Sequence, residues 1–168
     1  MTVPPRAPSG AIPRPGVGRG RVPVVAFVFT QGPLRSRIAA EFLKRATCGL
    51  VKVVQVGEPS GSRIEPSLRA YLKVRHGVVL DAAPPLPLTA RVLLESDHVI
   101  TMGCPEVCPI YEGRTYEDWE LEDPGGLAGA NLARAVRAIE VRSGLLGRRL
   151  SSEGKFHSRP NGGTGQLA

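Results

Sequence analysis

Short unbroken hydrophobic runs alternate along the chain with longer segments in which apolar residues recur at helical spacing. Three runs, residues 22–29, 51–56 and 98–102, are typical of parallel strands that are covered on both faces. Residues 116–119 form a weaker candidate for a fourth strand. The pattern therefore predicts a four-stranded parallel sheet.

Helical patterns lie between and after these runs. They predict helices at residues 34–46, 66–75, 89–95 and 128–146. Strands that alternate with helices predict right-handed βαβ units, with helices on both faces of the sheet. Ligands bind such sheets at the carboxyl ends of the strands, so the turn at 29–35 is the expected site.

Composition separates a central domain from two tails. Gly and Pro gather at both ends, and residues 22–147 sum to zero charge, so the net charge of +7 belongs to the ends. We expect a single α/β domain over 22–147 and disordered basic tails at 1–21 and 148–168. Solubilising or unselected tails are the favoured interpretation, and tail contacts with nucleic acid or anionic lipid are the alternative.

The cysteines and the hydropathy exclude several classes of protein. Three cysteines are too few for a disulfide scaffold, and no apolar stretch approaches the ~20 residues of a membrane span. The run at 22–29 follows a basic segment, as in a signal peptide, but it lacks a small-residue cleavage site and continues into a helical pattern. We expect a cytoplasmic protein without metal or cofactor, and the sequence does not indicate its oligomeric state.

The stretch "FTQGPLRS" at residues 29–36 joins the first predicted strand to the first predicted helix. A turn in this place gathers backbone N–H groups around an anion. Arg35 adds a forked, always-charged clamp at the start of the helix. The other candidate residues of this anion loop are Thr30, Gln31, Gly32, Leu34 and Ser36.

This loop and four later segments resemble the low-molecular-weight protein-tyrosine phosphatases and, within them, the related arsenate reductases. The family signature is a Cys, five residues and Arg-Ser between the first strand and the first helix, and "FTQGPLRS" aligns with it with Phe29 on the Cys. The later segments are "AAEFL" (39–43), "VGEP" (56–59), "SDHVITM" (96–102) and "YEDWELEDP" (116–124). The resemblance covers 22–147 and implies a phosphotyrosine protein phosphatase I-like fold.

The resemblance also implies roles for individual residues. In the family a Cys thiolate attacks phosphorus or arsenic, the Arg stabilises the equatorial oxygens, and an Asp before Pro protonates the leaving group. Arg35 would be the clamp and Asp123 the general acid, whereas Phe29 has no lone pair with which to attack. We therefore predict a degenerate, phosphatase-like or arsenate-reductase-like protein that binds phosphate, arsenate or another oxyanion weakly. It would act as a binding or regulatory module for an unknown protein partner.

Two simpler interpretations of these residues remain open. Arg35 could cap backbone carbonyls or pair with Asp123, and Asp123 could be no more than the first residue of an Asp-Pro turn.

A second cluster lies in "TMGCPEVCPIY" at residues 101–111, which carries Cys104 and Cys108. It resembles the arsenate reductase branch, in which cysteines after the third strand relay oxidation away from the first Cys. An active arsenate reductase or phosphatase-like enzyme that uses this pair as a redox dithiol is the alternative function. Reduced bystander cysteines are favoured, and metal binding would need two further ligands. Pro105 and Pro109 favour a loop with accessible thiols.

Overall fold

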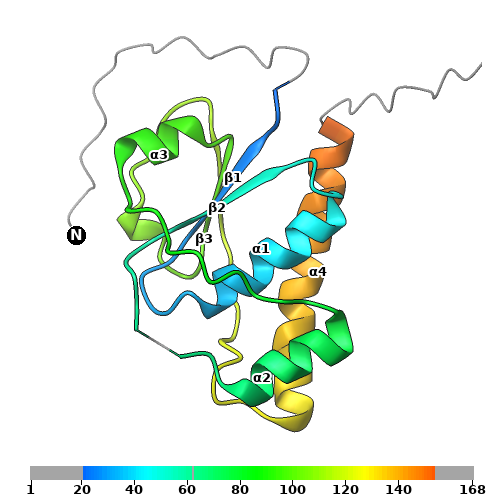
Figure 1. The fold of residues 1–168 in the computed structure, drawn as a ribbon. Coiled ribbons are helices and arrows are strands. Elements are labelled where there is room, and N and C mark those ends of the chain that lie inside the picture. Colours follow the sequence, from blue (N-terminus) through cyan, green and yellow to red (C-terminus); the bar gives the residue numbers. More distant parts are fainter. Residues whose placement is uncertain (1–20, 62, 154–168) are drawn as a thin grey trace, which may run out of the picture.

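Four parallel strands form the centre of the protein, which we describe from a computed structural model over residues 21–61 and 63–153 (Figure 1). The strands are β1 (Val24–Val28), β2 (Lys52–Val56), β3 (His98–Thr101) and β4 (Thr115–Asp118). Their order in the sheet is β2-β1-β3-β4, and every pairing is parallel. The four predicted strands are confirmed, with ends that differ by one or two residues.

The helices also follow the prediction. They are α1 (Leu34–Ala46), α2 (Pro66–Tyr71), α3 (Ala90–Glu95) and α4 (Gly129–Glu153), with a π-helical turn η1 (Leu72–His76) and a 3₁₀ turn η2 (Pro105–Val107). The predicted helix at 66–75 corresponds to α2 continued by η1. It stops at Gly77, whose φ of 63° is the left-handed conformation that glycine adopts most readily.

The C-terminal helix is longer than the sequence predicted. It was expected to end at residue 146, with a tail from 148, but α4 continues to Glu153. Leu146 and Leu150 are buried one turn apart, and Gly147 lies close to Ala46 of α1. This packing extends the helix through a segment that reads as polar and basic.

Helices cover both faces of the sheet (Figure 1). On one face α1 and α4 pack together over a core that includes Phe27, Trp119 and Ile139. On the other face a smaller cluster contains Val28, Leu93 of α3 and other buried residues. This arrangement confirms the predicted α/β class.

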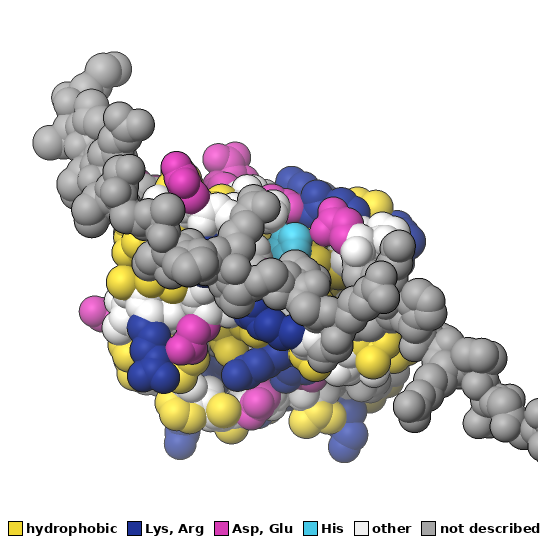
Figure 2. Space-filling view, turned by 90° about the horizontal axis from the view of Figure 1, so that it is seen from above, with side chains coloured by type: hydrophobic (Ala, Val, Ile, Leu, Met, Phe, Trp, Pro, Cys, Tyr) yellow, Lys and Arg dark blue, Asp and Glu magenta, His cyan; other side chains and the backbone are white. Residues whose placement is uncertain are grey.

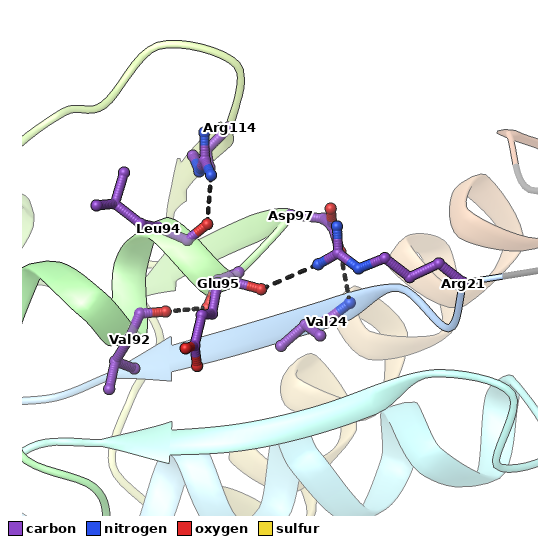
Figure 3. Close-up of polar contacts among 8 residues, drawn as sticks. Arg21, Val24, Val92, Leu94, Glu95, Asp97 and Arg114 are labelled. Carbon is purple, nitrogen blue, oxygen red and sulfur yellow. Dashed lines mark hydrogen bonds and ion pairs between the residues drawn. The ribbon is translucent and has the colours of Figure 1, made fainter. Parts of the chain in front are cut away.

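Polar contacts fix the amino end of the sheet, opposite to the expected binding turn (Figure 3). Arg21 donates to the Glu95 carbonyl, and Arg114 donates to the Leu94 carbonyl, so two arginines bond the last turn of α3. The carboxylate of Asp97 accepts the backbone N–H of Val24 at 2.8 Å. These bonds hold the start of β1 to the helix that precedes β3.

Residues 1–20 and 154–168 lie outside the described residues, so the tail predictions stay predictions for those two ranges. Figure 2 shows Lys and Arg side chains interspersed with acidic and hydrophobic ones on the face seen from above. This mixture agrees with the charge balance of the central residues. Within the described part, no stretch of helix combines the length and the hydropathy that a bilayer span requires.

Candidate anion site

The strand-to-helix turn lies where the sequence predicted it. β1 ends at Val28 and α1 begins at Leu34, so residues 29–33 connect them. Gly32 has a φ of 63°, which favours glycine at this position. The buried Ser36 hydroxyl donates to the Pro33 carbonyl at 2.8 Å and braces the turn. The amino terminus of a 13-residue helix thus follows directly on the candidate loop.

Phe29, at the head of the turn, is a core residue. Only 3% of it is exposed, and its backbone N–H donates to the Val56 carbonyl at 3.0 Å. A Cβ placed on Gly57 would lie 2.8 Å from the ring atoms Cε2 and Cζ of Phe29. The ring therefore packs against the backbone immediately after β2. Gly57 belongs to the "VGEP" segment, and the sequence did not predict this contact with the ring.

Arg35 lies between three segments of the chain. Its Nη1 donates to the Leu121 carbonyl at 2.9 Å, and a Cβ on Gly103 would lie 3.9 Å from the same nitrogen. Its Nε is buried and has no hydrogen-bond partner among the described residues. Carbonyl capping, one of the two simpler interpretations of Arg35, therefore occurs, and the Nε–H of the guanidinium is left without a partner among the described residues.

The Asp-Pro turn approaches the same end of α1 but does not pair with Arg35. Asp123 Oδ1 accepts the backbone N–H of Gly125 at 2.8 Å, and no ion pair joins Asp123 to Arg35 in the described structure. A Cβ on Gly125 would lie 3.1 Å from Asp123 Oδ1 and 3.5 Å from Leu34 Cδ2. The structure thus brings Asp123 near the loop as a turn residue, and its role as a general acid stays a prediction.

The other predicted loop residues differ in their surroundings. Thr30 and Gln31 are exposed, whereas Leu34 packs on the core and Ser36 is buried. The Ser36 hydroxyl is used inside the turn. Thr30 and Gln31 are therefore the side chains of this loop that solvent reaches most freely.

Cys104 and Cys108 are buried, so the prediction of accessible thiols is wrong. Their exposed fractions are 2% and 8%, because the Cys104 sulfur lies against β1 and Cys108 packs in the smaller core cluster on the sheet. Cys104 Sγ lies 3.7 Å from the Val28 carbonyl, beside the head of the turn. Burial, and to a lesser extent the neighbouring Cys104 thiol, raises the pKa of Cys108 to about 11. All three cysteines are free, and Cys48 is exposed.

Asp118 is a polar residue near the site whose contacts the sequence did not predict. Its Oδ1 accepts the Thr101 hydroxyl at 2.5 Å and the backbone N–H of Gly103 at 2.9 Å. Gly103 is the residue that lies beside the Arg35 guanidinium. Asp118 therefore positions the chain after β3 next to Arg35. The next residue, Trp119, is 1% exposed and packs on Phe27 and Arg142.

The sheet order, the turn after β1 and its arginine together define the fold class of the low-molecular-weight protein-tyrosine phosphatases and arsenate reductases. Comparisons with protein-family models and with curated proteins find no match. Solved structures of this class do match, which supports the family resemblance.

Three of these structures illustrate the similarity. A thioredoxin-dependent arsenate reductase from Corynebacterium glutamicum is 35% identical with a TM-score of 0.65, over 80% of this chain and 64% of that one. An arsenate reductase in the phosphate binding state is 28% identical with a TM-score of 0.58, over 77% and 99%. A protein tyrosine phosphatase from Entamoeba histolytica shares the fold at 18% identity with a TM-score of 0.62, over 79% and 97%. The present chain thus spans less than two thirds of the Corynebacterium protein.

Proposed function

We propose that this protein is a degenerate relative of the phosphatases and arsenate reductases that binds an oxyanion without forming a covalent intermediate. It would act as a binding or regulatory module. The observation that carries the proposal is Phe29, a buried phenyl ring at the head of the anion loop. Nucleophilic catalysis requires an electron pair on that residue, and a phenyl ring does not supply one.

The remaining thiols do not replace the missing nucleophile. Cys104 and Cys108 are buried, and a pKa of about 11 leaves Cys108 protonated at neutral pH. Because the thiolate is the reactive form, such a thiol is a poor nucleophile. The exposed hydroxyl of Thr30 is the nearest alternative in the loop, and a hydroxyl needs an adjacent base to attack.

Weak oxyanion binding is supported by the groups that remain. The N-terminus of α1 favours negative charge, and the buried Nε of Arg35 has no partner among the described residues. Pro33 lacks an N–H, and Arg35 Nη1 is occupied by the Leu121 carbonyl, so fewer donors face a ligand. A similar solved structure is an arsenate reductase in the phosphate binding state, which supports this ligand class.

Activity measurements test the absence of covalent catalysis. We expect wild-type protein to hydrolyse no p-nitrophenyl phosphate and to reduce no arsenate in the presence of a thiol. Phe29→Cys restores the family's attacking atom, and Phe29→Ala is the matched control that removes the ring without adding sulfur. Turnover by the wild type that disappears in Arg35→Ala would refute the proposal.

Phosphate titration followed by NMR tests the binding step. We expect millimolar phosphate to shift the amide signals of residues 30–32 and 34–36, and we expect Arg35→Ala to abolish these shifts. Arg37→Ala is the control, because Arg37 lies on the same helix and its Nε is also buried without a partner in the described structure. Equal loss of binding in both variants would show that total charge, and not the clamp, attracts phosphate.

A redox dithiol is the second candidate function. It is favoured by the place of Cys104 Sγ, 3.7 Å from the last carbonyl of β1 and beside the head of the candidate loop. Two thiols that close into a disulfide would supply the two electrons that reduce arsenate to arsenite. Thiol counting before and after mild oxidation tests this function, and two thiols that persist would exclude it.

A further inference from the structure

The outer edge of β2 carries a strand pairing that stops after one bridge. β2 lies at the edge of the sheet, and Val56 forms an isolated parallel bridge with Leu86. Leu86 N–H donates to the Gln55 carbonyl at 2.8 Å, and Gly57 N–H donates to the Leu86 carbonyl at 2.9 Å. In this register the next N–H that the loop before Leu86 could donate to β2 would come from Pro84, which has no N–H. The ladder therefore cannot continue.

A groove opens where this pairing ends. It has a volume of about 340 Å³ and lies between β2, helix α1 and the loop that leads to Leu86. Its lining residues are Lys52, Val53, Val54 and Gln55 of β2, Ala40 and Lys44 of α1, and Asp81, Ala83, Pro84 and Leu86 of the loop.

Backbone groups of β2 point into this groove without partners. Lys52 N–H and the Val56 carbonyl bond towards β1, so residues 52, 54 and 56 face inward and residues 53 and 55 face outward. The Gln55 N–H and the Val53 carbonyl have no hydrogen bond within the described part of the chain. Unpaired groups of this kind are the template on which an added strand forms.

We infer that this edge binds an extended acidic peptide segment of a partner protein as an additional strand. The outward Gln55 N–H and Val53 carbonyl would supply the main-chain hydrogen bonds of such a complex. The charges of the groove favour an acidic side chain, because two lysines, Lys44 and Lys52, line it against one carboxylate, Asp81. Lys44 is half-exposed, and its Nζ also forms an ion pair with Glu41 Oε1 at 2.8 Å.

The shape of the groove selects a single chain over a second copy of the protein. Two walls, α1 and residues 81–84, line the groove at the exposed edge. A second copy that approached with its own β2 would bring the same two walls, and both pairs would have to pass each other. One extended segment of three or four residues, at roughly 3.3 Å per residue, needs no such passage.

Selection from a display library of random heptapeptides tests the inference. We expect enriched peptides to be acidic and rich in β-branched residues, and the bound peptide to protect the Gln55 amide from hydrogen exchange. Lys52→Glu should weaken the selected peptide about tenfold, which is typical of a lost charge pair at a partly buried interface. Lys73→Glu is the matched control, because Lys73 is exposed on η1 and does not line the groove.

Other outcomes would overturn the inference. Enriched peptides without acidic residues, or equal affinities for Lys52→Glu and the control, would exclude charge recognition at this edge. Protection of residues 30–36 in place of Gln55 would move the binding to the anion loop. A dimer that light scattering detects in the wild type and not in Lys52→Glu would make a second copy the occupant. Phosphate binding by Arg35 is independent of each result, so the two proposals fail separately.

Discussion

The packing of Phe29 on Gly57 predicts the effect of adding one methyl group. In Gly57→Ala the new Cβ would lie 2.8 Å from Cε2 and Cζ of the ring and 2.6 Å from the Phe29 carbonyl oxygen. Phe29 and Gly57 are both buried, so neither residue can relieve the contact by moving into solvent. Overpacking of this kind costs about 1–3 kcal/mol of unfolding free energy.

A double-mutant cycle isolates the contribution of the ring. Phe29→Leu removes the two ring atoms that lie closest to Gly57 and leaves the carbonyl oxygen in place. The cost of Gly57→Ala should therefore fall in the Phe29→Leu background, with a coupling of about 0.5–2 kcal/mol, as for residues in direct contact. The contact with the carbonyl oxygen is common to both backgrounds and cancels in the cycle.

Urea unfolding followed by tryptophan fluorescence measures each free energy. The chain has one tryptophan, Trp119, which is 1% exposed and reports loss of the core. Gly61→Ala is the control, because a Cβ there meets nothing within 4 Å, and its effect should stay within about 0.5 kcal/mol. Equal costs of Gly57→Ala in both backgrounds would refute the placement of the ring.

Three further predictions concern other parts of the protein. Gly147→Ala should lower the unfolding free energy by about 1–3 kcal/mol, because its new Cβ would lie 2.8 Å from the Cβ of Ala46. Gly144→Ala on the same helix is the control, because a Cβ there meets nothing within 4 Å and should raise the unfolding free energy by up to ~1 kcal/mol in the same urea assay. Cys108, with a pKa of about 11, should react with a thiol reagent at pH 8 more slowly in the folded than in the urea-unfolded protein, and equal rates would contradict its burial. Burial alone would raise the pKa of Glu117, but hydrogen bonds from Trp119 and Arg149 lower it overall, so Glu117 stabilises the fold above its ordinary pKa. Glu117→Gln should therefore be less stable at pH 7, and its deficit should vanish as acid protonates the carboxyl in the wild type.

The hydrophobic pattern predicted the elements well because their burial is periodic. The α1 boundaries follow from Ile38 and Phe42 on one buried face, and β1 is buried along nearly its whole length. The end of α4 could not be predicted in this way. Its last turns are held by contact with Ala46, about a hundred residues earlier, and local polarity alone indicates a tail.

The position of the turn that carries the candidate site was predicted, but the contacts of its residues were not. The turn and Arg35 follow from a local signature, whereas the acceptor of Arg35 is a carbonyl 86 residues away. The thiols of Cys104 and Cys108 illustrate the same limit. Two prolines indicate a loop, but only the fold shows that η2 turns the sulfur atoms towards the sheet. The exposure of a side chain depends on contacts between distant segments, and the spacing of residues within one segment does not reveal those contacts.

The residues of this region that match the family signature therefore carry less functional information than their number indicates. Arg35 bonds the Leu121 carbonyl, Ser36 braces the turn through Pro33, and Asp123 closes its own turn at Gly125. Each bond stabilises the fold whether or not an anion binds, so each residue has a structural reason to be present. Phe29 is different, because its ring is compatible with the core and incompatible with nucleophilic attack. The proposed function as a binding module therefore rests on the identity of that one side chain, and not on the neighbours that match the family signature.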